Sequence, residues 1–182
     1  SEIIFTRNTT EGLNLAAQAL LHGRLRPGDR ILLPRAEHHS NFLPWQMLAA
    51  ERGMAVDLVD VEEDGTLSLE RVAAAIRPET KVAAFAHCSN VLGTIHPVRE
   101  LGRIFRERGI LFVVDGAQAV PHVPVNVQEI GCDFFAFSGY KIGAPMGIGI
   151  LYGREELMSE LPPFLRGGGM VQRADSERSE WR

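Results

Sequence analysis

Cysteine is scarce in this sequence, with only Cys88 and Cys132 among 182 residues. Two cysteines are too few for a disulfide framework, and they lack the CxxC spacing of a zinc site, so we expect no bound metal. No apolar run approaches the roughly 20 residues that a membrane-spanning helix needs, and the first residues do not resemble a signal peptide. We therefore expect a cytoplasmic protein that does not associate with membranes.

Basic residues are not in excess either. Lysine and arginine number 19 against 23 aspartates and glutamates, which gives a formal net charge of -4 at pH 7. A nucleic-acid-binding domain usually carries a basic patch, so we expect no nucleic-acid partner. Hydrophobic residues make up 45% of the chain, an ordinary share for a globular protein with one sizeable core.

Short apolar runs alternate with amphipathic segments along most of the chain. The expected strands cover residues 3–5, 30–33, 55–59, 82–86, 110–114, 134–137 and 148–152. The expected helices begin near Asn8 and His38 and cover 67–76 and 97–108. This α/β alternation predicts an open, mostly parallel, doubly wound sheet with helices on both faces. Residues 1–165 are expected to form this domain, and residues 166–182, which are glycine-rich and then polar, a tail or linker.

The most informative stretch covers residues 133–151. Its first apolar run, 134–137, is short enough for a buried strand and stops at Ser138, Tyr140 and Lys141. In open α/β sheets the ligand lies beyond the carboxyl ends of the strands. A lysine at that edge can attack a carbonyl group as a free amine. Taken alone, a surface lysine on a glycine-rich loop is the commoner outcome for such a short motif.

Other polar residues are expected at the same edge of the sheet. Asn90 follows one strand, and Asp115 with Gln118 follows the next. Thr9 and Thr10 offer hydroxyl and N–H groups to an anion at a helix start, although capping explains them equally well. His38, at another helix start, is either a ring that lies against a ligand or a solvated histidine. Together, a lysine, a carboxylate, a helix N-terminus that can bind a phosphate and a histidine ring suit pyridoxal 5′-phosphate (PLP).

Five sequence blocks strengthen this interpretation. They are TRNTTEG, EHHSN, HCSNVLGTIHPV, VDGAQAVPHVPV, and CDFFAFSGYK followed by GIGILYG. The blocks resemble, in order, those of cysteine desulfurases and selenocysteine lyases, in the class V aminotransferase group of the PLP fold-type I scaffold. The resemblance runs from near the first residue to about Leu165. It implies a PLP enzyme that converts L-cysteine to L-alanine and leaves a persulfide on the enzyme.

The resemblance also assigns roles to individual residues. Lys141 would bind the cofactor covalently, and Asp115 would pair with its pyridine nitrogen. Gln118 would bond its phenolic oxygen, while His38 would stack on the ring and help to move protons. Asn90 would face the ring and the substrate. The residues expected around the phosphate are Thr9, Thr10, Ser138 and Tyr140. Cysteine or selenocysteine would be the substrate, a sulfur-acceptor protein a possible partner, and the homodimer the expected assembly.

The chain also departs from the family pattern. Tyr140 stands where the family usually has a histidine, and a tyrosine cannot become cationic. Family members are roughly twice as long, so the chain is expected to be truncated at both ends. The nucleophilic cysteine and the arginine for the substrate carboxylate would lie in the absent C-terminal part. Neither Cys88 nor Cys132 matches that cysteine, and both are expected to be core thiols.

Two alternatives stay open. Another PLP enzyme of the same scaffold, a kynureninase-like lyase or an amino-acid epimerase, would share the cofactor residues. A non-catalytic, degenerate domain would oligomerise without binding PLP. Tyr140 favours the degenerate domain, whereas the presence of both Asp115 and Lys141 argues against it.

Overall fold

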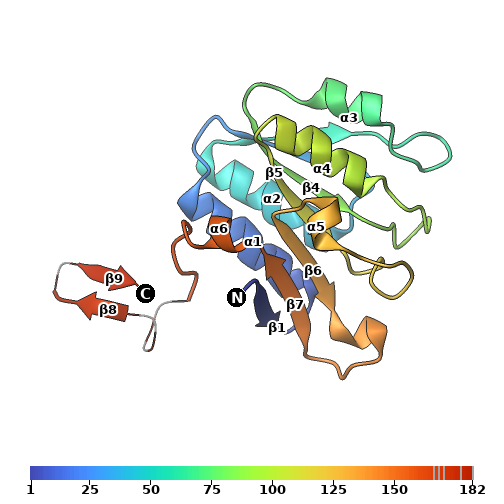
Figure 1. Cartoon of the computed structure of the whole chain (residues 1–182). Helices are drawn as coiled ribbons and strands as arrows, with labels where there is room; N and C mark the ends of the chain where they lie inside the picture. The colour runs from blue at the N-terminus through green and yellow to red at the C-terminus, as the bar shows by residue number, and fades with distance from the viewer. Residues whose placement is uncertain (166, 168, 170, 177, 182) are drawn as a thin grey trace.

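The computed structural model describes residues 1–165, 167, 169, 171–176 and 178–181. Its main feature is a seven-stranded mixed sheet in the order β1-β7-β6-β5-β4-β2-β3 (Figure 1). The strands are β1 (Ile3–Thr6), β2 (Arg30–Pro34), β3 (Ala55–Val59), β4 (Thr80–Ala86), β5 (Leu111–Asp115), β6 (Phe134–Ser138) and β7 (Gly149–Gly153). All seven strands expected from the sequence are therefore present.

The sheet is mostly parallel, as predicted. Strands β3, β2, β4, β5 and β6 form parallel pairs, whereas β7 runs antiparallel to both β6 and β1. The antiparallel pairing follows from the short connection between β6 and β7, since a parallel crossover needs a dozen or more residues. The structure thus has the open, mostly parallel α/β sheet predicted from the sequence, with an antiparallel edge.

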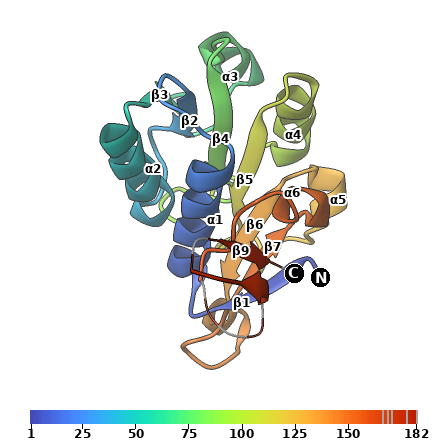
Figure 2. The same cartoon turned by 90° about the vertical axis from the view of Figure 1, so that its left-hand side faces the viewer.

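Helices cover both faces of the sheet (Figures 1 and 2). The helices α1, α2 and α6 pack on one face, and α3, α4 and α5 on the other. Their bounds are α1 (Thr9–Gly23), α2 (His39–Arg52), α3 (Leu69–Ala75), α4 (Val98–Glu107), α5 (Val127–Ile130) and α6 (Glu155–Met158). None of the described helices is both long and apolar enough to span a bilayer.

Strand β4 shows why the central strands read as continuous apolar runs. Its alternate residues Val82 and Ala84 join the core under α1 and α2, whereas Ala83 and Phe85 join the core under α3 and α4. Successive side chains of a strand point to opposite faces, so a strand covered on both faces is apolar throughout. These two cores hold the carboxyl ends of the strands in register at one edge.

The helix boundaries differ slightly from the sequence-based expectation. The helix expected over 67–76 is shorter, Leu69–Ala75, because the side chain of Ser68 accepts from Arg71 N and caps it. Asn8 caps α1 as predicted, with Oδ1 accepting from Glu11 N at 2.9 Å. In the C-terminal segment, β8 (Val171–Ala174) and β9 (Ser179–Trp181) pair as an antiparallel hairpin apart from the sheet in Figure 1. Residue 166, where the tail was expected to begin, lies outside the described residues.

Candidate functional site

A cavity of about 210 Å³ lies at the carboxyl ends of the strands. All nine site residues predicted from the sequence line it: Thr9, Thr10, His38, Asn90, Asp115, Gln118, Ser138, Tyr140 and Lys141. The lining also includes five residues that were not among the predicted site residues: Asn8, Ser40, Ala86, Cys88 and Ala117. Residues as far apart in the chain as Asn8 and Lys141 therefore converge on one space.

One wall of the cavity is a corner between the start of α1 and the end of β6. The Thr9 N–H donates to Ser138 Oγ at 2.8 Å, and Thr9 Oγ1 lies 2.7 Å from the same oxygen. Both side chains are buried. The close packing requires glycine at position 149, since a Cβ there would lie 2.7 Å from the Asn8 Cα. Hydroxyl groups at the N-terminus of a 15-residue helix suit a bound anion such as a phosphate.

The starts of α1 and α2 are joined at the same wall. Thr10 Oγ1 and Ser40 Oγ lie 2.8 Å apart, in a hydrogen bond whose donor is either hydroxyl. The Ser40 N–H donates to His38 Nδ1 at 3.1 Å, so His38 is the N-cap of α2. Because Nδ1 accepts this bond, the neutral ring carries its proton on Nε2. His38 is exposed, so its ring remains accessible to a ligand in the cavity.

Asp115, the last residue of β5, supplies a buried acid. It is only 5% exposed, and its Oδ1 accepts from Ala117 N at 2.9 Å. Burial raises the pKa of Asp115, while the Ala117 N–H and the charges of His38 and Lys141 oppose that rise. Among the described residues Asp115 forms no ion pair, and a buried carboxylate is unfavourable without one. The cavity therefore contains a buried acid that a cationic group of a ligand would stabilise.

Lys141, another lining residue, lies on the short 3-10 helix η1 (Gly139–Ile142) that follows β6. It is half-buried, and Tyr140 beside it is exposed. The sequence has only one other lysine, Lys81, which lies near the amino end of β4 and donates to Pro78 O at 3.3 Å. Lys141 is therefore the only primary amine of a side chain at this cavity.

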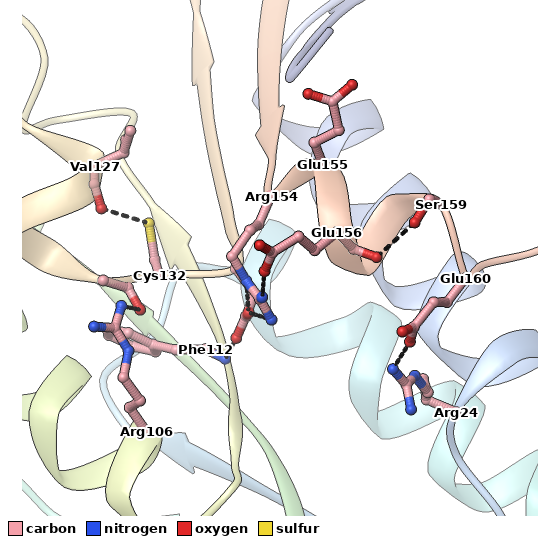
Figure 3. A network of polar contacts seen from close by, with 12 residues as sticks. Arg24, Arg106, Phe112, Val127, Cys132, Arg154, Glu155, Glu156, Ser159 and Glu160 are labelled. Atoms are coloured by element: carbon pink, nitrogen blue, oxygen red, sulfur yellow. Dashed lines mark hydrogen bonds and ion pairs between the residues drawn. The ribbon is translucent and has the colours of Figure 1, made fainter.

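The two cysteines have different surroundings. Cys132 is buried in the core under α4, and burial is the main reason why its pKa is raised to about 12. Its sulfur lies 4.0 Å from the Val127 carbonyl, which confirms the predicted core thiol (Figure 3). Cys88 is also buried, but it lines the cavity, and its Sγ lies 3.7 Å from Gly93 O. Burial raises the pKa of Cys88 as well, so both are poor thiolates at neutral pH.

A larger cavity of about 650 Å³ lies at the opposite, amino edge of the sheet. Around it Arg154 donates to Asp133 at 2.9 Å and to Glu156 at 2.8 Å, and Arg24 pairs with Glu160 (Figure 3). None of the nine predicted site residues lines this cavity. Among the described residues, no cluster of three histidine, cysteine or acidic side chains could hold a metal ion at either edge.

Comparisons with known proteins agree with this geometry. A cysteine desulfurase of Serratia proteamaculans is 48% identical over 94% of this chain and 42% of its own length. A probable cysteine desulfurase of Halalkalibacterium halodurans is 44% identical over 100% of this chain and 45% of its own. The chain thus spans less than half the length of these curated relatives.

Solved structures show the same partial match. The apo cysteine desulfurase of Thermococcus onnurineus has a TM-score of 0.91 at 42% identity, and covers 100% of this chain and 45% of its own. The cysteine desulfurase CsdA of Escherichia coli, in an S-sulfonic acid form, has a TM-score of 0.93 at 36% identity over the same shares. The protein-family model described as "Aminotransferase class-V" matches residues 1–182. The chain belongs to the aminotransferase class-V family.

Proposed function

We propose that this chain is the cofactor-binding portion of a PLP-dependent cysteine desulfurase. One observation carries the proposal: Lys141, Asp115 and the Thr9–Ser138 corner line a single cavity at the edge where α/β sheets bind ligands. A cofactor with an aldehyde, a basic ring nitrogen and a phosphate matches these three groups in turn. The 44% and 48% identical relatives favour desulfuration over the other reactions of this scaffold.

The residues divide the binding of PLP between them. The Lys141 amine would bind the aldehyde covalently, and the Asp115 carboxylate would accept a hydrogen bond from the protonated ring nitrogen. The Gln118 amide would face the phenolic oxygen. When bound, PLP supplies an electron sink for the α-carbon of the amino-acid substrate. Thr9, Thr10, Ser138 and Tyr140 would hold the phosphate.

His38 and Asn90 act on the substrate side. His38 would lie against the ring, and its Nε2–H, the ring group that Ser40 N–H does not engage, would donate a hydrogen bond to the substrate. Asn90 holds the substrate through its side-chain amide. Tyr140 replaces a histidine of the family pattern, but it retains a hydroxyl that can donate one hydrogen bond to the phosphate.

The proposed partners follow from the same site. Cysteine or selenocysteine would be the substrate, and a structure of a protein named SspA in complex with cysteine aligns with this chain at a TM-score of 0.85. Two loops that contribute residues to the cavity also carry exposed apolar side chains: Val91, next to Asn90, is 79% exposed, and Met146, in the loop after Lys141, is 85% exposed. These side chains support a homodimer across this edge. A sulfur-acceptor protein and a cytoplasmic location are proposed from the family resemblance, and the two free thiols agree with a reducing compartment.

A borohydride trap tests the proposed cofactor. Incubation with PLP and borohydride should attach one pyridoxyl group, and peptide mass spectrometry should locate it on Lys141. Lys81→Ala is the matched control, because it removes the only other lysine and leaves the cavity unchanged. An adduct that persists in Lys141→Ala, or that maps to Lys81, would contradict the proposal.

A further inference from the structure

Glu37 is a buried acid that immediately precedes His38 in the sequence, and the reaction described above does not use it. Glu37 is only 8% exposed, and both of its carboxyl oxygens have hydrogen-bond partners. Oε1 accepts from Ala86 N at 2.6 Å, and Oε2 accepts from Asn41 Nδ2 at 2.9 Å. Ala86 is the last residue of β4, and Asn41 belongs to the first turn of α2. Glu37 therefore links the helix start that carries His38 to the end of a central strand.

The link fills a gap in the sheet. The pairing of β2 with β4 ends at Leu32 and Ala83, yet β4 continues to Ala86. Beyond that point β2 offers no carbonyl to the buried Ala86 N–H, and buried N–H groups need an acceptor. The Glu37 side chain supplies it. The Ala86 carbonyl also bonds to a side chain, the Nδ1 of His96 at 2.8 Å.

The surroundings of Glu37 favour an uncharged acid. The carboxyl group is almost fully buried, and among the described residues no cation pairs with it. Burial raises the pKa of Glu37 to about 8 and the nearby Asp115 charge adds to that rise, whereas the groups that donate to the carboxylate, the N–H groups of Ala86 and His38 and the Asn41 amide, oppose it. Asp133 offers a contrast within the same sheet. It also accepts from a strand N–H, Phe112 N at 2.8 Å, but Arg154 pairs with it at 2.8 Å.

We propose that Glu37 is a positioning residue that, as a neutral carboxylic acid, fastens the His38 helix start to β4 and leaves Asp115 as the only negative charge beneath the ring. The inference rests on the proposed PLP function for its effect on the cofactor. Two buried acids with different partners take different roles, since Asp115 gains a cation on cofactor binding and Glu37 does not. A second negative charge there would disfavour the ionised form of Asp115, which must be negative to hold the proton on the ring nitrogen.

The first test needs no cofactor. Infrared spectra of the cofactor-free chain at pH 7 should contain a protonated-carboxyl C=O band that disappears in Glu37→Gln and remains in Asp115→Asn. Asp133→Asn is the matched control, because it removes a buried but ion-paired carboxylate and should leave this band unchanged. If no such band is lost in Glu37→Gln, Glu37 is ionised and the proposal is wrong.

The second test separates a neutral hydrogen bond from a charge. Glu37→Gln keeps an acceptor for Ala86 N, so hydrogen exchange at that N–H should stay slow and PLP binding should remain within about threefold of wild type. Glu37→Ala should expose the N–H to exchange and weaken PLP binding by about tenfold or more. Equal losses in both variants, or no loss in either, would overturn the positioning role. If wild type itself does not bind PLP, the proposed function fails, while infrared and hydrogen exchange still decide the role of Glu37.

Discussion

Thr9 and Ser138, which lie 129 residues apart in the sequence, are joined by two hydrogen bonds that both involve Ser138 Oγ. Ser138 Oγ accepts from the Thr9 N–H at 2.8 Å and lies 2.7 Å from Thr9 Oγ1. The contact joins a helix N-terminus to the carboxyl end of a central strand, where hydroxyl groups and the helix start would suit a phosphate. The Thr9–Ser138 corner, which is the phosphate corner of the proposed site, is therefore formed by the folded chain itself.

Ser138→Ala should weaken PLP binding through the phosphate alone. The change leaves the buried Thr9 N–H without its acceptor, which destabilises the fold by about 1–3 kcal/mol. The affinity for PLP should fall, whereas that for pyridoxal, which has no phosphate, should stay unchanged. Fluorescence titration with both compounds measures the difference, and Ser159→Ala, an exposed site, is the control. Equal losses for PLP and pyridoxal would indicate a general distortion instead.

Asp115→Asn should preserve the fold and remove the electron-sink chemistry. The neutral amide still accepts from Ala117 N, but it cannot hold a proton on the ring nitrogen. PLP binding should weaken, and exchange of the substrate α-proton with deuterium should cease. Asp133→Asn should lower the stability of the fold, because it breaks the buried pair with Arg154, but it should leave α-proton exchange in place. Full α-proton exchange in Asp115→Asn would exclude the assigned role.

The stability of the cofactor-free chain should decrease as the pH rises from about 4.5 to about 8. Glu37 releases its proton near pH 8 in the folded chain but near its ordinary pKa of 4.5 when unfolded. In this window the folded chain binds more protons, so its free energy of unfolding falls with pH by a few kcal/mol in total. Urea denaturation of wild type and Glu37→Gln at several pH values measures this contribution. Identical pH profiles for the two proteins would contradict it.

This chain alone should bind PLP without releasing sulfur from cysteine. Desulfuration needs a thiolate within about 3–3.5 Å of the substrate sulfur. Cys132 lies in the core, and burial raises the pKa of Cys88, whose sulfur lies near the Gly93 carbonyl. Incubation with PLP and cysteine should give neither alanine nor a protein-bound persulfide. Stoichiometric alanine that disappears in Cys88→Ser would make Cys88 a nucleophile after all.

Much of the fold could be read from the sequence because the two cores impose continuous apolar runs on the central strands. The positions of Asp115 and Ser138 at strand ends follow from where those runs stop. The direction of β7 was not predicted, since an apolar run is the same in either direction and only the length of its connection decides. The short helices α5 and α6 have too few residues to show a helical period.

The contacts behind the site could not be predicted in the same way. Glu37 and Ala86 lie 49 residues apart, and no local pattern shows that β2 and β4 stop pairing before β4 ends. Ser40 likewise belongs to an expected helix start, but its contact with Thr10 depends on how α1 and α2 pack. That both of these polar residues support the site follows only from the packing of segments that are distant in sequence.

The antiparallel pairing of β6 with β7 has a further consequence for the lysine. Ser138 pairs with Gly149, so residues 139–148 form a closed loop whose base is fixed by the sheet. Lys141 belongs to the loop, whereas the phosphate corner belongs to its base. Insertions or deletions between 143 and 147 can therefore shift the reach of the amine while the anchor for the cofactor stays in place. In the proposed site, changes in this loop would adjust where the covalent bond forms without altering where the cofactor is held.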